Sequence, residues 1–92
     1  MDWNSKEKTK FIRAILALKT TAEAECFLRD LMTEGEIEEF SKRLKAAEML
    51  SQNISYEKIE KETGLSSTTI ARVSKWLNGR EGGYKLVLKR IK

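Results

Sequence analysis

Ser55 to Asn78 reads SYEKIEKETGLSSTTIARVSKWLN, and this stretch carries the strongest structural signal of the chain. Ser55 can cap a short helix, because its hydroxyl can accept a hydrogen bond from a free amide of the first turn. Gly64 then interrupts that helix, since glycine adopts a positive φ at little energetic cost in a tight turn. Ser66 or Ser67 caps a second helix that extends to about Asn78. Two helices joined by a short glycine-containing turn predict a helix-turn-helix at about residues 55–78.

The second helix of this unit has the chemistry of a DNA-reading surface. Ile70, Val73 and Leu77 recur at helical spacing and predict its inner face. The residues at its N-terminal end are small or hydroxyl-bearing and two basic residues follow, so the helix can enter a groove about 12 Å wide and contact base edges, thymine methyls and phosphates. The residues expected to contact DNA are Ser66, Ser67, Thr68, Thr69, Ala71, Arg72 and Lys75, with Lys58 of the first helix as a further phosphate contact. An ordinary helical hairpin with Ser and Thr caps is the alternative interpretation.

The rest of the chain also predicts helices. The whole sequence contains no proline, and its five glycines fall at only four places. Residues 6–19 carry the apolar stripe of an amphipathic helix, and residues 84–91 predict a short basic helix. Thr20 with Glu23, and Thr33 with Glu36, have the spacing of capping boxes, each opening a further helix. We therefore expect an all-α fold of about six helices in a single domain over residues 1–92.

The size of the chain predicts that it forms an oligomer. A domain of 92 residues has a thin core and usually needs a disulfide, a metal or a partner chain for stability. One cysteine and no histidine leave no disulfide and no apparent zinc site. The third predicted helix carries an apolar stripe near heptad spacing, which suits packing against a second subunit. That stripe consists of Ile37, Phe40, Leu44, Ala47 and Leu50.

Charge is divided unevenly along the chain, although the net charge is only +4. Residues 20–62 carry six basic and eleven acidic side chains, whereas residues 63–92 carry seven basic side chains and one acidic. Residues 1–19 carry five basic and two acidic side chains. Both ends can therefore face a polyanion such as double-stranded DNA. A solvated surface of mixed charge is the alternative interpretation.

The composition argues against several classes of protein. Without histidine, Cys26 has no imidazole to activate it, and its place in an apolar stripe predicts a small buried side chain. No glycine-rich phosphate loop or paired carboxylates stand out, so we expect no enzyme, no metal and no cofactor. No apolar run is long enough to cross a membrane, and the first residues contain no signal-peptide core. We expect a cytoplasmic protein with no membrane partner and assign no small-molecule ligand.

Residues from about Phe27 to Leu77 resemble the tryptophan-repressor superfamily, in particular its small TrpR-like proteins of the YerC/YecD type. The resemblance rests on the segment FLRDLMT from Phe27 to Thr33, on the amphipathic helix that holds Arg43, and on Ser55 to Arg72 with Gly64 at the turn. It implies an intertwined homodimer with two helix-turn-helix heads that reach successive major grooves, about 34–36 Å apart.

The resemblance also implies where a tryptophan corepressor is held in the family. Thr33, Arg43 and Arg72 match its positions, but Val73 stands where the repressor has glycine, and Trp76 stands where it has serine. A valine and an indole there are expected to block the cavity, with Trp76 as a built-in occupant. We therefore expect no dependence on free tryptophan. The operator is also expected to differ from the tryptophan operator, since Glu57 replaces an arginine that faces DNA.

The sequence thus predicts a sequence-specific, dimeric DNA-binding transcriptional regulator, most simply a repressor. Two alternatives remain at this level. A helical protein-interaction adaptor that kept the fold without DNA binding suits Glu57 and the acidic middle segment. The DNA-binding domain of a replication initiator shares the helical superfamily, but the short chain lacks an ATPase segment.

Overall fold

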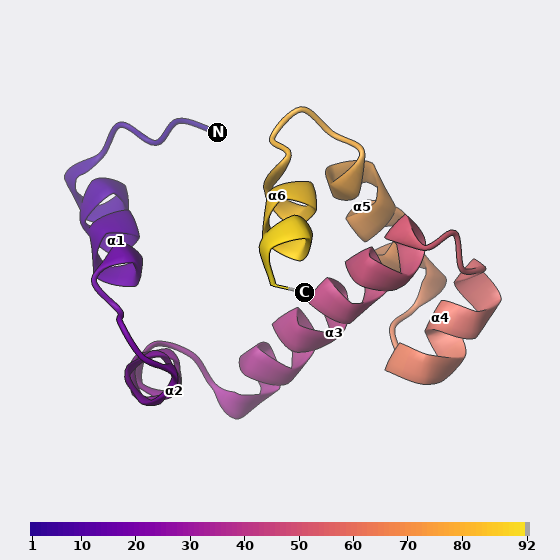
Figure 1. The fold of residues 1–92 in the computed structure, drawn as a ribbon, viewed down its shortest axis with the longest axis horizontal. Helices are drawn as coiled ribbons and strands as arrows, with labels where there is room; N and C mark the ends of the chain where they lie inside the picture. The colour runs from indigo at the N-terminus through magenta and orange to yellow at the C-terminus, as the bar shows by residue number, and fades with distance from the viewer. Residues whose placement is uncertain (92) are drawn as a thin grey trace. The chain divides into compact units, whose positions relative to one another are not determined.

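All regular structure in the described chain is helical (Figure 1). The computed structural model describes residues 1–91. Within these residues there are six helices and no strand, which confirms the predicted all-α class and helix number. The helices are α1 (Lys6–Leu16), α2 (Thr21–Leu31), α3 (Glu34–Ser51), α4 (Tyr56–Thr63), α5 (Ser67–Leu77) and α6 (Gly83–Arg90).

The chain divides into two compact units, one from Met1 to Ile37 and one from Glu38 onward. In the first unit, neither α1 nor α2 contains a buried residue. The prediction that Cys26 is buried is therefore wrong for the single chain: its side chain is exposed, because no other described residue covers that side of α2. The second unit holds every buried residue of the described chain.

The helix starts follow the predicted capping chemistry. The Thr20 hydroxyl accepts a hydrogen bond from the Glu23 amide at 3.1 Å, and the Glu23 carboxylate accepts one from the Lys19 amide at 2.9 Å. A complete capping box opens α3, where Thr33 and Glu36 each accept from the other's amide, at 3.1 and 2.9 Å. The α1 helix ends at Leu16, before the predicted end at residue 19, because Lys19 is already part of the cap of α2.

The core of the second unit seats the helix-turn-helix on the C-terminal half of α3. Fully buried Ile59 of α4 and Ile70 and Val73 of α5 form one apolar cluster with three residues of α3. Those three are Ala46, Ala47 and Met49. Helix α5 also packs against α6, whose Tyr84 and Leu88 are partly buried against the cluster. The inner face predicted for α5 is thus confirmed.

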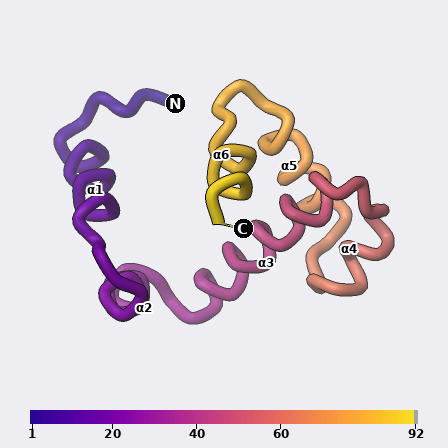
Figure 2. Tube along the Cα trace, viewed as in Figure 1, coloured from indigo at the N-terminus to yellow at the C-terminus, as the bar shows by residue number. Residues whose placement is uncertain are grey.

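Figure 2 shows the path of the chain through the turn between α4 and α5. One threonine and one glycine hold this turn. The buried Thr63 hydroxyl donates to the Ile59 carbonyl at 2.7 Å and accepts from the Leu65 amide at 3.2 Å. Gly64 ends α4 with a φ of 76°, in the left-handed region that glycine enters most easily. Its amide donates to the Glu60 carbonyl at 2.9 Å. These bonds fix the path of the chain into α5.

Gly64→Ala is expected to lower the free energy of unfolding by about 1–2 kcal/mol, because a β-carbon is disfavoured at positive φ. A β-carbon at Gly64 meets no atom within 4 Å, so the loss comes from the backbone rather than from a clash. Gly64→Asn is expected to lose less. Urea denaturation at a fixed protein concentration measures the effect.

Gly83→Ala is the matched control. Gly83 begins α6 without a positive φ and also has open space around it, so alanine there is expected to be neutral or slightly stabilising. Equal losses at the two glycines would contradict the conformational explanation.

Candidate nucleic-acid interface

One side of α5 is free to meet a large ligand. Ile70, Val73 and Leu77 are buried, and the opposite side of the helix faces solvent. The exposed side carries Ser67, Thr68, Ala71, Arg72 and Lys75. These are the predicted base-facing residues together with both basic residues, so the structure brings them onto one helical surface. We call this set the α5 outer face.

The hydroxyl groups at the start of α5 fall into two classes. Ser66 is the N-cap: its hydroxyl accepts from the Thr69 amide at 3.2 Å and donates to the Thr69 hydroxyl at 3.1 Å. These two hydroxyls therefore stabilise the first turn of the helix. Ser67 and Thr68 have exposed hydroxyls with no hydrogen-bond partner among the described residues. They are the hydroxyls that remain free to contact a ligand.

The α5 outer face is positively charged. Helix α5 contains no acidic residue, and neither Arg72 nor Lys75 makes an ion pair with another described residue. Lys58 is exposed in the first turn of α4, where its amide donates to the Ser55 cap. Glu57 beside it is exposed as well and lowers the positive charge of α4. Of the two helices of the helix-turn-helix, α5 therefore carries the more purely positive surface.

The arginine expected at a corepressor position is already engaged within its own helix. Arg43 Nε lies 3.2 Å from Glu39 Oε2, and its guanidinium carbon lies 5.4 Å from the centre of the Phe40 ring. The Arg43 guanidinium, which was expected at a corepressor position, is therefore already in contact with Glu39 and Phe40. The spacing of Glu39 and Arg43, four residues apart on a helix, is the sequence signal for this pair.

The other corepressor positions lie in different surroundings. Val73 is fully buried in the core cluster, so its side chain fills space that glycine leaves open. Arg72 belongs to the α5 outer face. The Thr33 hydroxyl is the N-cap of α3. Thr33 belongs to the first unit, whereas the four other positions belong to the second.

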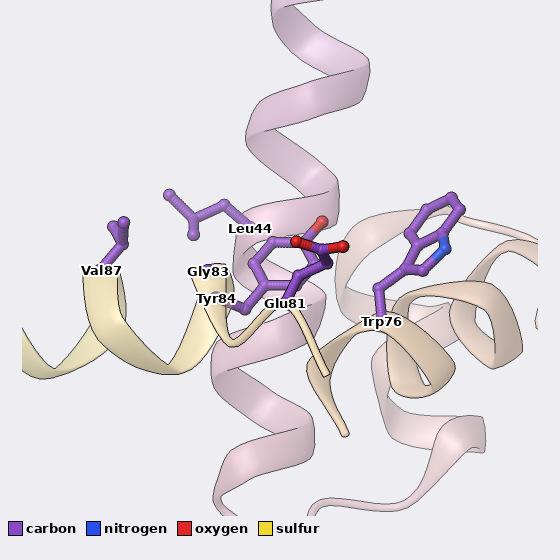
Figure 3. Close-up of a pocket in the computed structure, with 6 residues that line it drawn as sticks. All are labelled: Leu44, Trp76, Glu81, Gly83, Tyr84 and Val87. Carbon is purple, nitrogen blue, oxygen red and sulfur yellow. The ribbon is translucent and has the colours of Figure 1, made fainter. Parts of the chain in front are cut away.

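Trp76 borders an open, largely apolar pocket of about 460 Å³ (Figure 3). Its indole is 49% exposed, so a single chain does not enclose it. Leu44 of α3 and Tyr84 and Val87 of α6 line the pocket with Glu81 and Gly83. Burial raises the pKa of the Tyr84 phenol above its ordinary value of 10.0, although the positive charge of Arg43 opposes that shift. The phenol is therefore neutral near pH 7.

The described residues offer neither a metal site nor a membrane span. Residues 1–91 contain no group of three or more Cys, Asp or Glu side chains arranged to hold a metal ion. None of the helices in the described part of the chain is long and apolar enough to span a bilayer.

Four buried residues were missed by reasoning from the sequence, namely Thr63, Leu65, Ala46 and Met49. Thr63 could have been noticed, because a threonine just before a turn glycine can bond to the carbonyl four residues earlier. Ala46 and Met49 lie beside the predicted apolar stripe of α3, and a small side chain such as alanine gives a weak hydrophobic signal. Ala47 belongs to that stripe, which was expected to suit a second subunit, but it is fully buried in the core of its own chain.

Comparison with known proteins assigns the chain to a family. The profile of the family described as Trp repressor protein matches residues 6–92. The chain is 41% identical over 87 residues to the uncharacterized protein YerC of Bacillus subtilis (strain 168), a match that spans 95% of this chain and 84% of YerC. It is also similar to the crystal structure of a TrpR-like protein from Eubacterium eligens ATCC 27750. The TM-score is 0.90 and the identity 37%, with 97% of this chain and 92% of the other covered.

These matches run over nearly the whole chain and include both the helix-turn-helix and the helices on either side of it. They confirm the resemblance inferred from the sequence, down to the YerC type. The family is a regulatory one whose members bind DNA. In this chain α4 and α5 form the helix-turn-helix, and α5 has an exposed, basic side. The chain belongs to the Trp repressor family, as a TrpR-like protein of the YerC type.

Proposed function

We propose that the chain is a homodimeric, sequence-specific DNA-binding transcriptional repressor that acts without free tryptophan. The observation that carries the proposal is the α5 outer face. It places unpaired Arg72 and Lys75 beside the free hydroxyls of Ser67 and Thr68, on a helix seated rigidly against the core. Cations bind phosphates, and hydroxyls bond to base edges, so the surface combines affinity with sequence reading. Membership in the Trp repressor family supports the same interpretation.

Homodimer formation is supported by the apolar surface that one chain leaves in solvent. Phe11, Ile12 and Ile15 are each about 40% exposed or more on α1, and Phe40 is 45% exposed on α3. The open pocket at Trp76 adds a further apolar surface. Large apolar side chains exposed together on one helix, as on α1, are typical of an interaction site. A second copy can cover it and set two α5 helices at the spacing of successive major grooves, about 34 Å.

Independence from tryptophan is supported by the corepressor positions. Val73 fills the core, and Arg43 is paired with Glu39 and stacked on Phe40. A free amino acid then finds the Val73 side chain where glycine leaves space, and it must compete with Glu39 for the Arg43 guanidinium. The target sequence is expected to differ from the tryptophan operator for a separate reason. Ser67, Thr68 and Ala71 stand at the base-facing positions with other identities than in the repressor, and exposed Glu57 stands where the repressor presents an arginine to DNA.

A protein-interaction adaptor is the second candidate. The exposed Glu57 on α4 and the acidic middle of the chain favour it, because both repel a nucleic acid. The two candidates differ in whether the purified protein binds DNA at all.

DNA binding is expected to weaken steeply with salt. For the wild-type protein the logarithm of the affinity for a genomic fragment is expected to fall linearly with the logarithm of salt concentration, by about 0.9 for each phosphate neutralised. Arg72→Ala with Lys75→Ala is expected to flatten that slope, whereas Lys42→Ala with Lys45→Ala, the same charge change on α3, leaves it unchanged. Fluorescence anisotropy measures both. Absence of binding to any genomic fragment would favour the adaptor.

The assembly is expected to contain two chains. Size-exclusion chromatography with light scattering is expected to give twice the chain mass of 10.6 kDa, about 21 kDa. Phe11→Glu is expected to raise the dimer dissociation constant at least about tenfold, because it places a charge in the apolar contact. Thr9→Ala, also exposed on α1 but on its polar side, is the control. A mass of 10.6 kDa at micromolar concentration would exclude the dimer.

Free tryptophan is expected to have no effect. Titration of the protein with L-tryptophan in a calorimeter is expected to give no saturable heat, since the Val73 side chain occupies the core and Arg43 is paired. The affinity for DNA is expected to be the same with and without tryptophan. Saturable binding that also tightens the DNA complex would overturn this part of the proposal.

A further inference from the structure

Helix α1 has a second cationic surface that the helix-turn-helix does not use. Lys6, Lys10 and Arg13 are spaced by four and three residues, so they lie along one side of the helix. All three are exposed, and they border one open hollow of about 470 Å³ together with Thr9. We call these three basic residues and Thr9 the α1 cationic face.

The charges of this face are not neutralised within the described chain. None of the three cations makes a side-chain hydrogen bond or an ion pair with another described residue. Glu7 lies three residues before Lys10, yet the two side chains do not pair. On α3, by contrast, Glu39 and Arg43 do form an ion pair. The Thr9 hydroxyl, an additional donor beside the cations, has no hydrogen-bond partner among the described residues either.

The apolar side of α1 is directed away from these charges. Phe11, Ile12 and Ile15 fall on the opposite side of the helical wheel from the three cations. An apolar contact with a second subunit therefore leaves the α1 cationic face in solvent. The apolar side of α1 and its cationic side are thus separate surfaces, and the cations remain free to contact a polyanion.

We infer that the α1 cationic face makes a second contact with the DNA sugar-phosphate backbone. This inference rests on the proposed function. A helix rises 1.5 Å per residue, so Lys6 and Arg13 are about 10 Å apart along α1. Successive phosphates of one strand advance about 3.4 Å along the duplex axis, so the face spans roughly three of them. Three cations and a hydroxyl donor offer the chemistry for phosphate oxygens, but no group arranged to distinguish bases. The contact therefore adds affinity for any sequence.

The test uses the full-length protein with Lys10→Gln and Arg13→Gln together, since glutamine keeps the helix propensity while removing the charge. Anisotropy is measured across a salt series on a random-sequence duplex and on a genomic fragment that the wild type binds. The slope of log affinity against log salt is expected to become shallower by about 1 for each phosphate that the variant no longer neutralises. Affinity for the two duplexes is expected to fall by the same factor, about tenfold or more at low salt.

Lys42→Gln with Lys45→Gln on α3 is the matched control, because the loss of charge is identical. Circular dichroism and light scattering check that the α1 variant keeps its helices and its mass. An unchanged slope would overturn the inference while leaving the function of α5 intact, provided that Arg72→Ala with Lys75→Ala still flattens it. A variant that changes the mass instead of the slope would also overturn it and show that the face pairs with a second copy. Failure of the wild type to bind either duplex would overturn the proposed function itself.

Discussion

The contact between two alanines of α3 and the apolar side of the helix-turn-helix sets the position of every residue that α5 presents to solvent. Ala46 and Ala47 are fully buried, together with Ile59 and Val73. Here the alanine methyl groups of α3 are part of a close-packed core, which accepts little extra volume. A larger side chain at either alanine costs about 1–3 kcal/mol through overpacking and displaces the helices. The geometry of the candidate DNA surface is therefore a consequence of small residues on another helix.

The two units of the chain differ in how far they bury their apolar residues. The second has a core, although a small one, and carries the α5 outer face. In the first, neither α1 nor α2 contains a fully buried residue, and large apolar side chains of both helices are exposed. Such helices are stable when a partner covers them, because short isolated helices are marginal in water. In the proposed homodimer, folding of the first unit and association of the two chains are therefore expected to be one process rather than two.

Much of this architecture was predictable from local chemistry. The capping residues Thr20, Thr33 and Ser55 and the positive φ of Gly64 follow from hydrogen bonding and backbone sterics within a few residues, and the structure confirms them. The choice between Ser66 and Ser67 as the cap of α5 needed the structure, since either hydroxyl has suitable spacing.

Features that depend on other helices were harder to predict. Burial of Cys26 was predicted wrongly, because periodicity identifies an apolar side but not whether the same chain covers it. The same limit applies to Ala47, which packs into the core of its own chain. The pairing of Arg43 and the exposure of Trp76 likewise depend on neighbours from other turns and helices. The exposed members of α5 were predictable, since helical spacing alone separates them from the buried ones.

The division of hydroxyls at the start of α5 has an evolutionary consequence. Ser66 and Thr69 hold the helix together, whereas Ser67, Thr68 and Ala71 support nothing inside the described molecule. Substitutions at these last three positions leave folding nearly untouched, as is usual for surface sites without structural partners. Under the proposed function, descendants of such a chain can change their target DNA sequence through a few point substitutions, without first having to gain stability elsewhere.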